Sequence, residues 1–155
     1  MAEESKEFIV EIFREEIRNL ARDNMNFLQV LSTGPHSQVL VMSLLPGEDF
    51  GEGISHSDQF VIVEQGTGEL TVEGMTTPFG PGEVVHIPGG LHHNVRADRE
   101  NNVKLTVVCA PALYPPRDCQ PTKAEAAAAQ AEAQARNSRH ELARTRSRFL
   151  ATERG

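Results

Sequence analysis

The stretch that decides the fold is "GPGEVVHIPGGLHHNV", residues 80–95. It contains a glycine turn at Gly82, a short apolar run, and a Pro-Gly-Gly corner at residues 88–90. Such a corner turns the chain back, because glycine accepts turn conformations and proline interrupts a strand ladder. The stretch therefore predicts two short strands, with His93 at the start of the second and aimed inward, where a neutral imidazole can bind a metal.

Short β-type runs, broken by Gly, Pro and Asn, surround this stretch. They are "FLQVLS", "QVLVMSLL", "QFVIVE", "GELTVE", "GEVVHIP", "HHNVRA" and "VKLTVVCA". Close spacing with no helical pattern between the runs indicates a sandwich or barrel rather than βαβ units. The prediction is an all-β core between residues 27 and 112.

The segments that flank the core carry helical patterns. Apolar residues recur at steps of three and four from Glu3 to Met25, which predicts an amphipathic helix that packs on the main body or on a partner chain. After the proline-rich "APALYPPRDCQP", Thr122 and Glu125 have capping-box spacing ahead of an alanine-rich run. That run predicts a partly ordered helix that frays or lies against a neighbouring subunit. The predicted organisation is an N-terminal helix (1–25), a barrel (26–114), and a proline-rich linker with a helical tail (115–155).

Composition and charge narrow the function classes. A chain of 155 residues suits one domain with tails, and its net charge of -7 argues against non-specific binding of nucleic acid. Six arginines and two glutamates between Arg136 and Arg154 give a local charge of +4, which favours a solvated basic tail over a site for an acidic partner. No apolar run is long enough to cross a bilayer, and the acidic N-terminus is unlike a secretory signal, so we expect a cytoplasmic protein without a membrane partner.

The two cysteines do not suggest a metal or disulfide framework. Cys109 and Cys119 lie ten residues apart, outside any CxxC or His-adjacent spacing. Cys109 follows the apolar "LTVV" and is predicted to be a small core residue.

The stretch from Gly82 to His93 resembles the second conserved motif of the cupin superfamily, G-x5-P-x-G-x2-H-x3-N, with Ala97 at the final Asn position. The first cupin motif, G-x5-H-x-H-x3,4-E-x6-G, is matched loosely by "GEDFGEGISHSDQFVIVEQGTGEL". Residues 24–126 resemble small bacterial cupins that are often labelled mannose-6-phosphate isomerase-like. The resemblance implies a cupin double-stranded β-helix (jelly-roll) barrel, a homodimer, and a bound divalent metal ion such as Fe, Mn, Zn or Ni.

The resemblance also implies a set of metal ligands, and His93 matches its position without adjustment. In the first motif Gln59 takes the usual Glu position, and His56 is the only histidine available for the H-x-H pair. The two lie three residues apart, so they can converge only if "HSDQ" forms a turn or bulge. Glu52 is the nearest replacement for the missing donor, because glycines on either side could let it fold inward.

For three of these candidate ligands an interpretation without a metal stays open. His93 is alternatively a pocket histidine in a barrel that has lost its metal, and His56 an exposed loop residue. Gln59 is alternatively a hydrogen-bonding group of the pocket, since an amide is a weaker metal ligand than a carboxylate.

Three functions compete at this stage. The first is a metal-dependent enzyme that acts on a small polar molecule in the barrel mouth by oxygenase, isomerase or lyase chemistry. In that case Glu52, Gln59 or His86 would move or steer a proton. The second is a module that binds a small ligand without turnover, and the third is an inert scaffold assembled through its helices. The sugar-phosphate isomerase activity is not supported, because the barrel segment offers few basic residues to hold a phosphate: Arg96, Arg99 and Lys104.

Overall fold

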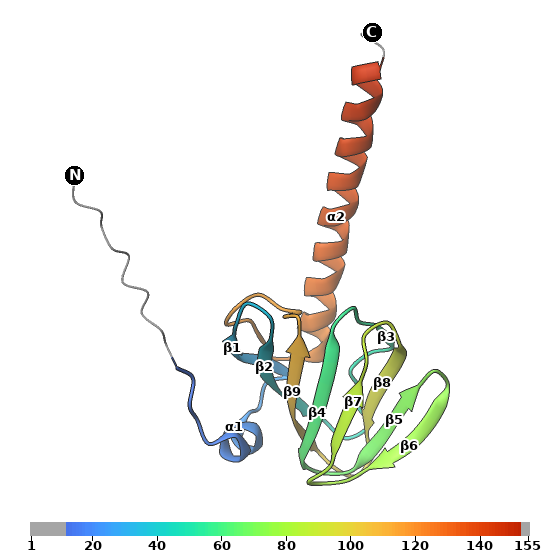
Figure 1. Cartoon of the computed structure of the whole chain (residues 1–155). Helices are drawn as coiled ribbons and strands as arrows, with labels where there is room; N and C mark the ends of the chain where they lie inside the picture. Colours follow the sequence, from blue (N-terminus) through green and yellow to red (C-terminus); the bar gives the residue numbers. More distant parts are fainter. Residues whose placement is uncertain (1–11, 153–155) are drawn as a thin grey trace, which may run out of the picture.

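The computed structural model describes residues 12–152, and its centre is a barrel made of two antiparallel sheets (Figure 1). Sheet A has the strand order β10-β1-β2-β9-β4-β7, and sheet B has the order β3-β8-β5-β6. The strands are β1 Leu28–Thr33, β2 Gln38–Leu44, β3 Gly53–Ile54, β4 Asp58–Gln65, β5 Gly68–Val72, β6 Met75–Phe79, β7 Val84–Ile87, β8 His92–Ala97, β9 Val103–Ala110 and β10 Cys119–Gln120. The prediction of an all-β jelly roll is confirmed.

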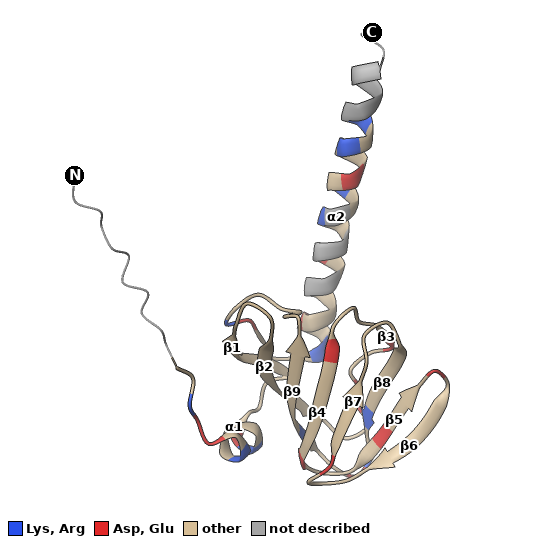
Figure 2. Ribbon diagram, in the orientation of Figure 1, with Lys and Arg blue, Asp and Glu red and all other residues tan. Residues whose placement is uncertain are grey.

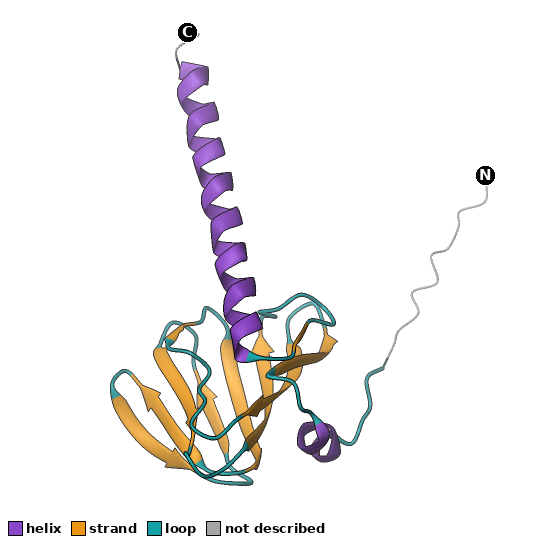
Figure 3. Ribbon diagram, turned by 180° about the vertical axis from the view of Figure 1, so that it is seen from behind, coloured by secondary structure: helices purple, strands orange, loops and turns teal. Residues whose placement is uncertain are grey.

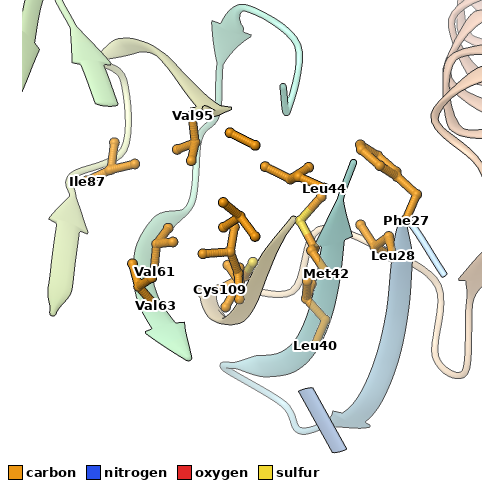
Figure 4. Packing of buried hydrophobic residues seen from close by; sticks show 14 of the residues in the cluster. Phe27, Leu28, Leu40, Met42, Leu44, Val61, Val63, Ile87, Val95 and Cys109 are labelled. Carbon is orange, nitrogen blue, oxygen red and sulfur yellow. The ribbon is translucent and has the colours of Figure 1, made fainter. Parts of the chain in front are cut away.

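The hydrophobic core lies inside the barrel, between the two sheets (Figure 4). Successive side chains of a strand point to opposite faces, so every second residue contributes to the core. Met42 of β2, for example, lies opposite Leu105 of β9 in the antiparallel register. The buried cluster includes Leu40, Met42 and Leu44 of β2, Val103, Leu105 and Val107 of β9, Val61 of β4, Ile87 of β7 and Val95 of β8.

All seven runs that the sequence predicted as strands form strands, and three further strands escaped prediction. β3 and β10 have only two residues each, which is too short for an alternating pattern to appear. β6 exposes every residue except Phe79 and contains Pro78, a composition typical of an edge strand.

The first helix, α1 (Ile17–Asp23), is shorter than the predicted helix from Glu3 to Met25. Part of the predicted segment, residues 1–11, lies outside the described residues, and residues 12–16 are not helical. The Glu16 side chain accepts a hydrogen bond from the Asn19 N–H at 2.9 Å, which caps the helix at this point. α1 packs on the outer face of sheet A, where Ala21 is fully buried.

The second helix, α2 (Lys123–Thr152), stands away from the barrel as one continuous helix (Figures 1 and 3). Thr122 Oγ1 accepts a hydrogen bond from the Glu125 N–H at 3.2 Å, as the predicted cap requires. Ala126 is buried at the base of the helix, and Figure 2 shows basic residues at several points along the helix beyond it. Neither described helix is long and apolar enough to span a bilayer.

Candidate functional site

Gln59 is the first inward-facing residue of β4. It is 7% exposed and alternates with Val61 and Val63, which belong to the core. Phe60, which lies between Gln59 and Val61 on the strand, points to the outer face of the sheet and is 40% exposed. The Oε1 atom of Gln59 is buried and has no hydrogen-bond partner. A buried amide oxygen without a partner is uncommon, because it loses its interaction with water and gains none in return.

His93 faces the same interior from the opposite sheet. It is 7% exposed and alternates with Val95 and Ala97, which are core residues of β8. Its Nδ1 lies 2.9 Å from the carbonyl oxygen of Leu91. A carbonyl oxygen can only accept, so Nδ1 carries the proton of this bond, and the remaining nitrogen, Nε2, is left to accept a hydrogen bond or to coordinate a metal.

The two side chains lie at the same end of the barrel, because the turns that precede them are held together. The Gly90 N–H donates to the Ser55 carbonyl oxygen at 2.7 Å, and the Gly89 N–H donates to Asp58 Oδ1 at 2.8 Å. A Cβ atom on Gly89 would lie only 2.7 Å from the His56 carbonyl oxygen, so this close approach requires glycine. The Pro-Gly-Gly corner therefore positions β8 against the loop that begins β4.

A buried thiol and a second glutamine extend this interior layer, and the sequence reasoning did not count them as site residues. Cys109 of β9 lies in register between Gln38 of β2 and Gln59 of β4, and it is buried, as predicted. Burial raises the pKa of its thiol to about 11, so the thiol is protonated at neutral pH. Strand alternation on β9 could have placed Cys109 in this layer, since Val103, Leu105 and Val107 precede it on the same face.

The buried side chain of Gln38 links this interior layer to the proline-rich segment 111–118. Its Nε2 donates to the Tyr114 carbonyl oxygen at 2.8 Å, and its Oε1 accepts from the Tyr114 N–H at 3.1 Å. Burial, together with the nearby Cys109 and Asp118, raises the pKa of the Tyr114 hydroxyl to about 12. Both the oxygen and the nitrogen of the Gln38 side chain therefore have hydrogen-bond partners, whereas the side-chain oxygen of Gln59 has none.

His56 and Glu52 do not join Gln59 and His93 in the interior, because both side chains are exposed. The chain does bend between β3 and β4, as convergence of His56 and Gln59 would require, but the bend buries Ser57 instead. Ser57 donates its hydroxyl to the Pro111 carbonyl oxygen at 2.7 Å, and its N–H donates to Ser55 Oγ at 3.1 Å. The serine pair thus turns the imidazole of His56 outward.

His86 is also separated from the interior layer. Its ring stacks on Phe60, with 4.3 Å between the ring centroids and 1° between the planes. Phe60 and Gln59 are adjacent on β4 and point to opposite faces of sheet A. The structure therefore places the proton-transfer candidate His86 on the outer surface, across the sheet from Gln59.

Comparison with known proteins identifies the family of this barrel. The Cupin domain family matches residues 40–109. The crystal structure of BH2720 from Bacillus halodurans is similar with a TM-score of 0.74 and 33% identity, over 78% of this chain and 97% of that one. The chain belongs to the cupin superfamily. These matches do not point specifically to the mannose-6-phosphate isomerase-like group.

Two further proteins are similar to this cupin in sequence. YrkC of Bacillus subtilis (strain 168), an uncharacterized protein, is 33% identical over 132 residues, which cover 81% of this cupin and 68% of YrkC. L612 of Acanthamoeba polyphaga mimivirus, also uncharacterized, is 31% identical over 105 residues, which cover 64% of this cupin and 66% of L612. This cupin therefore spans about two thirds of the length of each relative.

The residues present do not fit the divalent metal ion that the cupin fold implies. Catalytic zinc and non-heme iron centres use three side-chain donors, commonly with a carboxylate or thiolate among them. The interior of this cupin presents two neutral donors, His93 Nε2 and Gln59 Oε1, beside the protonated thiol of Cys109. Within residues 12–152, no group of three His, Cys, Asp or Glu side chains could hold a metal ion.

Proposed function

We propose that this cupin binds a small neutral polar molecule at Gln59 and His93, without a resident metal ion and without turnover. The observation that carries the proposal is the unpartnered Oε1 of Gln59. Leaving a buried acceptor unpaired costs about 1–3 kcal/mol, and a ligand that donates a hydrogen bond to it would recover that cost. Such arrangements concentrate at sites where stability is given up for binding.

The chemistry of the two side chains defines the ligand class. Gln59 Oε1 and His93 Nε2 both accept hydrogen bonds, so the ligand presents two N–H or O–H donors, as a polyol, a sugar or a primary amide does. The neighbouring core residues are apolar: Val61 and Val95 lie two residues further along the same strands, and Ile87 pairs with Gln59, which favours a ligand with a hydrocarbon body.

The positions of the basic residues support a neutral ligand rather than a phosphate ester. Arg96 points outward and pairs with Asp49 at 3.0 Å. Lys104 is buried beneath α1 on the outer face of sheet A, and Arg99 is exposed. None of these three side chains faces the interior, so none of them is placed to neutralise a phosphate bound there.

Binding of a defined panel tests the proposal. Neutral monosaccharides, polyols and primary amides are screened by ligand-detected NMR against the purified protein, against Gln59→Met and against the matched control Gln65→Met, an exposed glutamine of the same strand. We expect a panel member to bind the parent and Gln65→Met, and to bind Gln59→Met at least tenfold more weakly. Binding that is unchanged in Gln59→Met would overturn the proposal.

Metal analysis separates this proposal from the metal-dependent enzyme that the sequence suggested. The protein is purified without chelators, and its metal content is compared with that of His93→Ala. One equivalent of Fe, Mn, Zn or Ni in the parent that is lost in His93→Ala would favour the metalloenzyme. A metal content far below one equivalent in both proteins would favour the binding module.

The homodimer implied by the family resemblance is part of the proposal. Phe60 and Val84 are 40% and 61% exposed on the outer face of sheet A, and a second copy would cover them. Sedimentation equilibrium of the parent and of Val84→Lys tests this pairing. A dimer that weakens in Val84→Lys would support it, and an unchanged dimer would place the interface elsewhere.

A further inference from the structure

Gly53 occupies the position beside His93 from which a protein side chain could enter the site. β3 pairs antiparallel with β8, with Gly53 opposite His93 and Ile54 opposite His92. Residues directly opposite each other in such a pair carry their side chains on the same face. Ile54, at 60% exposed, and the exposed His92 mark the outer face, so Gly53 and the buried His93 mark the inner one.

Neither the backbone nor the packing requires glycine at this position. Six other glycines have a positive φ, and Gly53 is not among them. A Cβ atom built on Gly53 meets no atom within 4 Å, whereas one on Gly68 would lie 2.1 Å from the Arg96 carbonyl oxygen. The absent side chain therefore leaves open space at position 53, which pairs with His93 across the two strands.

We infer that Gly53 determines the specificity of the interior site in two ways. The open space at position 53 receives the ligand, and the lack of a donor side chain at this position keeps the site free of metal. The first half of this inference rests on the proposed function. The second half concerns the protein alone. A donor at position 53 would join His93 Nε2 and Gln59 Oε1 to make three protein ligands, with a fourth position left for water. One substitution should therefore convert the site into a metal centre.

Cobalt binding tests the metal half, because four-coordinate Co²⁺ bound by protein ligands has d–d bands that are far stronger than those of hydrated Co²⁺ and lie at longer wavelength. We compare the parent, His93→Ala, Gly53→His and the double variant Gly53→His/His93→Ala, each titrated with Co²⁺. We expect Gly53→His to bind one equivalent with new visible bands. The parent and the double variant should bind at least tenfold more weakly and show no such bands.

The outcomes of the cobalt titration are decisive in both directions. If the parent binds one equivalent of Co²⁺ that His93→Ala loses, the site already has enough donors and the inference is overturned. If Gly53→His folds and binds no cobalt, or if it does not fold, position 53 is not the open inward position described. Gly53→Ala, which adds a Cβ without a donor, is the control for folding.

The ligand half is tested with the molecule that binds best in the neutral panel. Gly53→Val fills the space above position 53 without adding a donor, and we expect its affinity for that molecule to fall at least tenfold. Equal affinity in Gly53→Val would overturn this half. If no panel member binds the parent, the proposed function and the ligand half fail together, while the cobalt result still decides the metal half.

Discussion

The ammonium group of Lys104 lies 2.6 Å from the carbonyl oxygen of Asn24, the C-cap residue that follows α1. The same Nζ donates to Ser43 Oγ at 2.9 Å, so one buried lysine joins two strands of sheet A to the helix that covers them. Burial lowers the pKa of this lysine, and the nearby charge of Asp23 opposes that change. The hydrogen bonds to neutral oxygens keep the buried ammonium satisfied.

Ser43→Ala should destabilise the protein by about 1–3 kcal/mol, because it removes one acceptor from a buried charged donor. Urea unfolding measures the change in the free energy of unfolding. Ser37→Ala is the control, since Ser37 is exposed, and it should change stability by less than about 0.5 kcal/mol. Equal effects of the two substitutions would show that the lysine does not depend on Ser43.

Two buried glutamines on the same sheet should respond in opposite ways to replacement by methionine. Gln59→Met removes an unpaired oxygen and keeps the shape of the side chain, so it should raise the free energy of unfolding by about 1–2 kcal/mol. Gln38→Met loses bonds to Thr33 and Tyr114 and should lower it by about 2–3 kcal/mol. Thermal and urea unfolding measure the change in the free energy of unfolding for each variant. A loss of stability in Gln59→Met would mean that its oxygen is paired in solution.

The strands were predictable because burial on one face leaves an alternating pattern in the sequence. In β4 the pattern places Gln59 inward and Phe60 outward, and the structure does so. The Pro-Gly-Gly corner at residues 88–90 predicted His93 inward at the start of the next strand, and the structure buries it there. These two residues were accessible to sequence reasoning because each belongs to a regular strand of several residues.

The exposed position of His56 was not predictable from the sequence. Side chains alternate between the two faces only along a regular strand, and His56 lies in a bend between two strands. Whether residue 56 or 57 turns inward depends on the hydrogen bond from Ser57 to Pro111, a residue more than fifty positions away. Gly53 was read as a hinge for Glu52, and its pairing with His93 appears only once β3 is seen in the sheet. Long-range pairing of a two-residue strand leaves no local signal.

Stability should fall at high pH because of the buried thiol of Cys109. Its folded-state pKa of about 11 lies above the ordinary value of 9.0, so the contribution is complete below about pH 9 and is lost as the pH rises through about 11. Between about pH 8 and pH 11 the parent should lose about 2 kcal/mol more than Cys109→Ala. Urea unfolding under reducing conditions measures this difference. Part of the raised pKa of Tyr114 comes from Cys109, so the difference between the two proteins also includes the coupling of that hydroxyl to the thiol.

Asp49 anchors the base of α2 to the barrel, and this anchor should weaken in acid. Its carboxylate accepts hydrogen bonds from Lys123, the first residue of α2, and from Asn94 and Arg96 of β8. Burial alone would raise its pKa, but the bonds from Lys123 and Asn94 and the charges of Lys123 and Arg96 outweigh it and hold the pKa below 3.8. The contribution is therefore present above the ordinary pKa and is lost as the pH falls through the lowered value.

Asp49→Asn should weaken the attachment of α2 to the barrel even at neutral pH, because it removes the negative charge that pairs with Lys123 and Arg96. We expect faster hydrogen exchange at the Ala126 N–H, which donates to the Thr122 carbonyl oxygen at 3.1 Å in the first turn of α2. Asp98→Asn is the matched control, because Asp98 is another barrel carboxylate and accepts a hydrogen bond from Thr67 Oγ1, at 2.6 Å, rather than from Lys123. Exchange at Ala126 that is equally fast in both variants would mean that the proline-rich connection, and not Asp49, holds the helix in place.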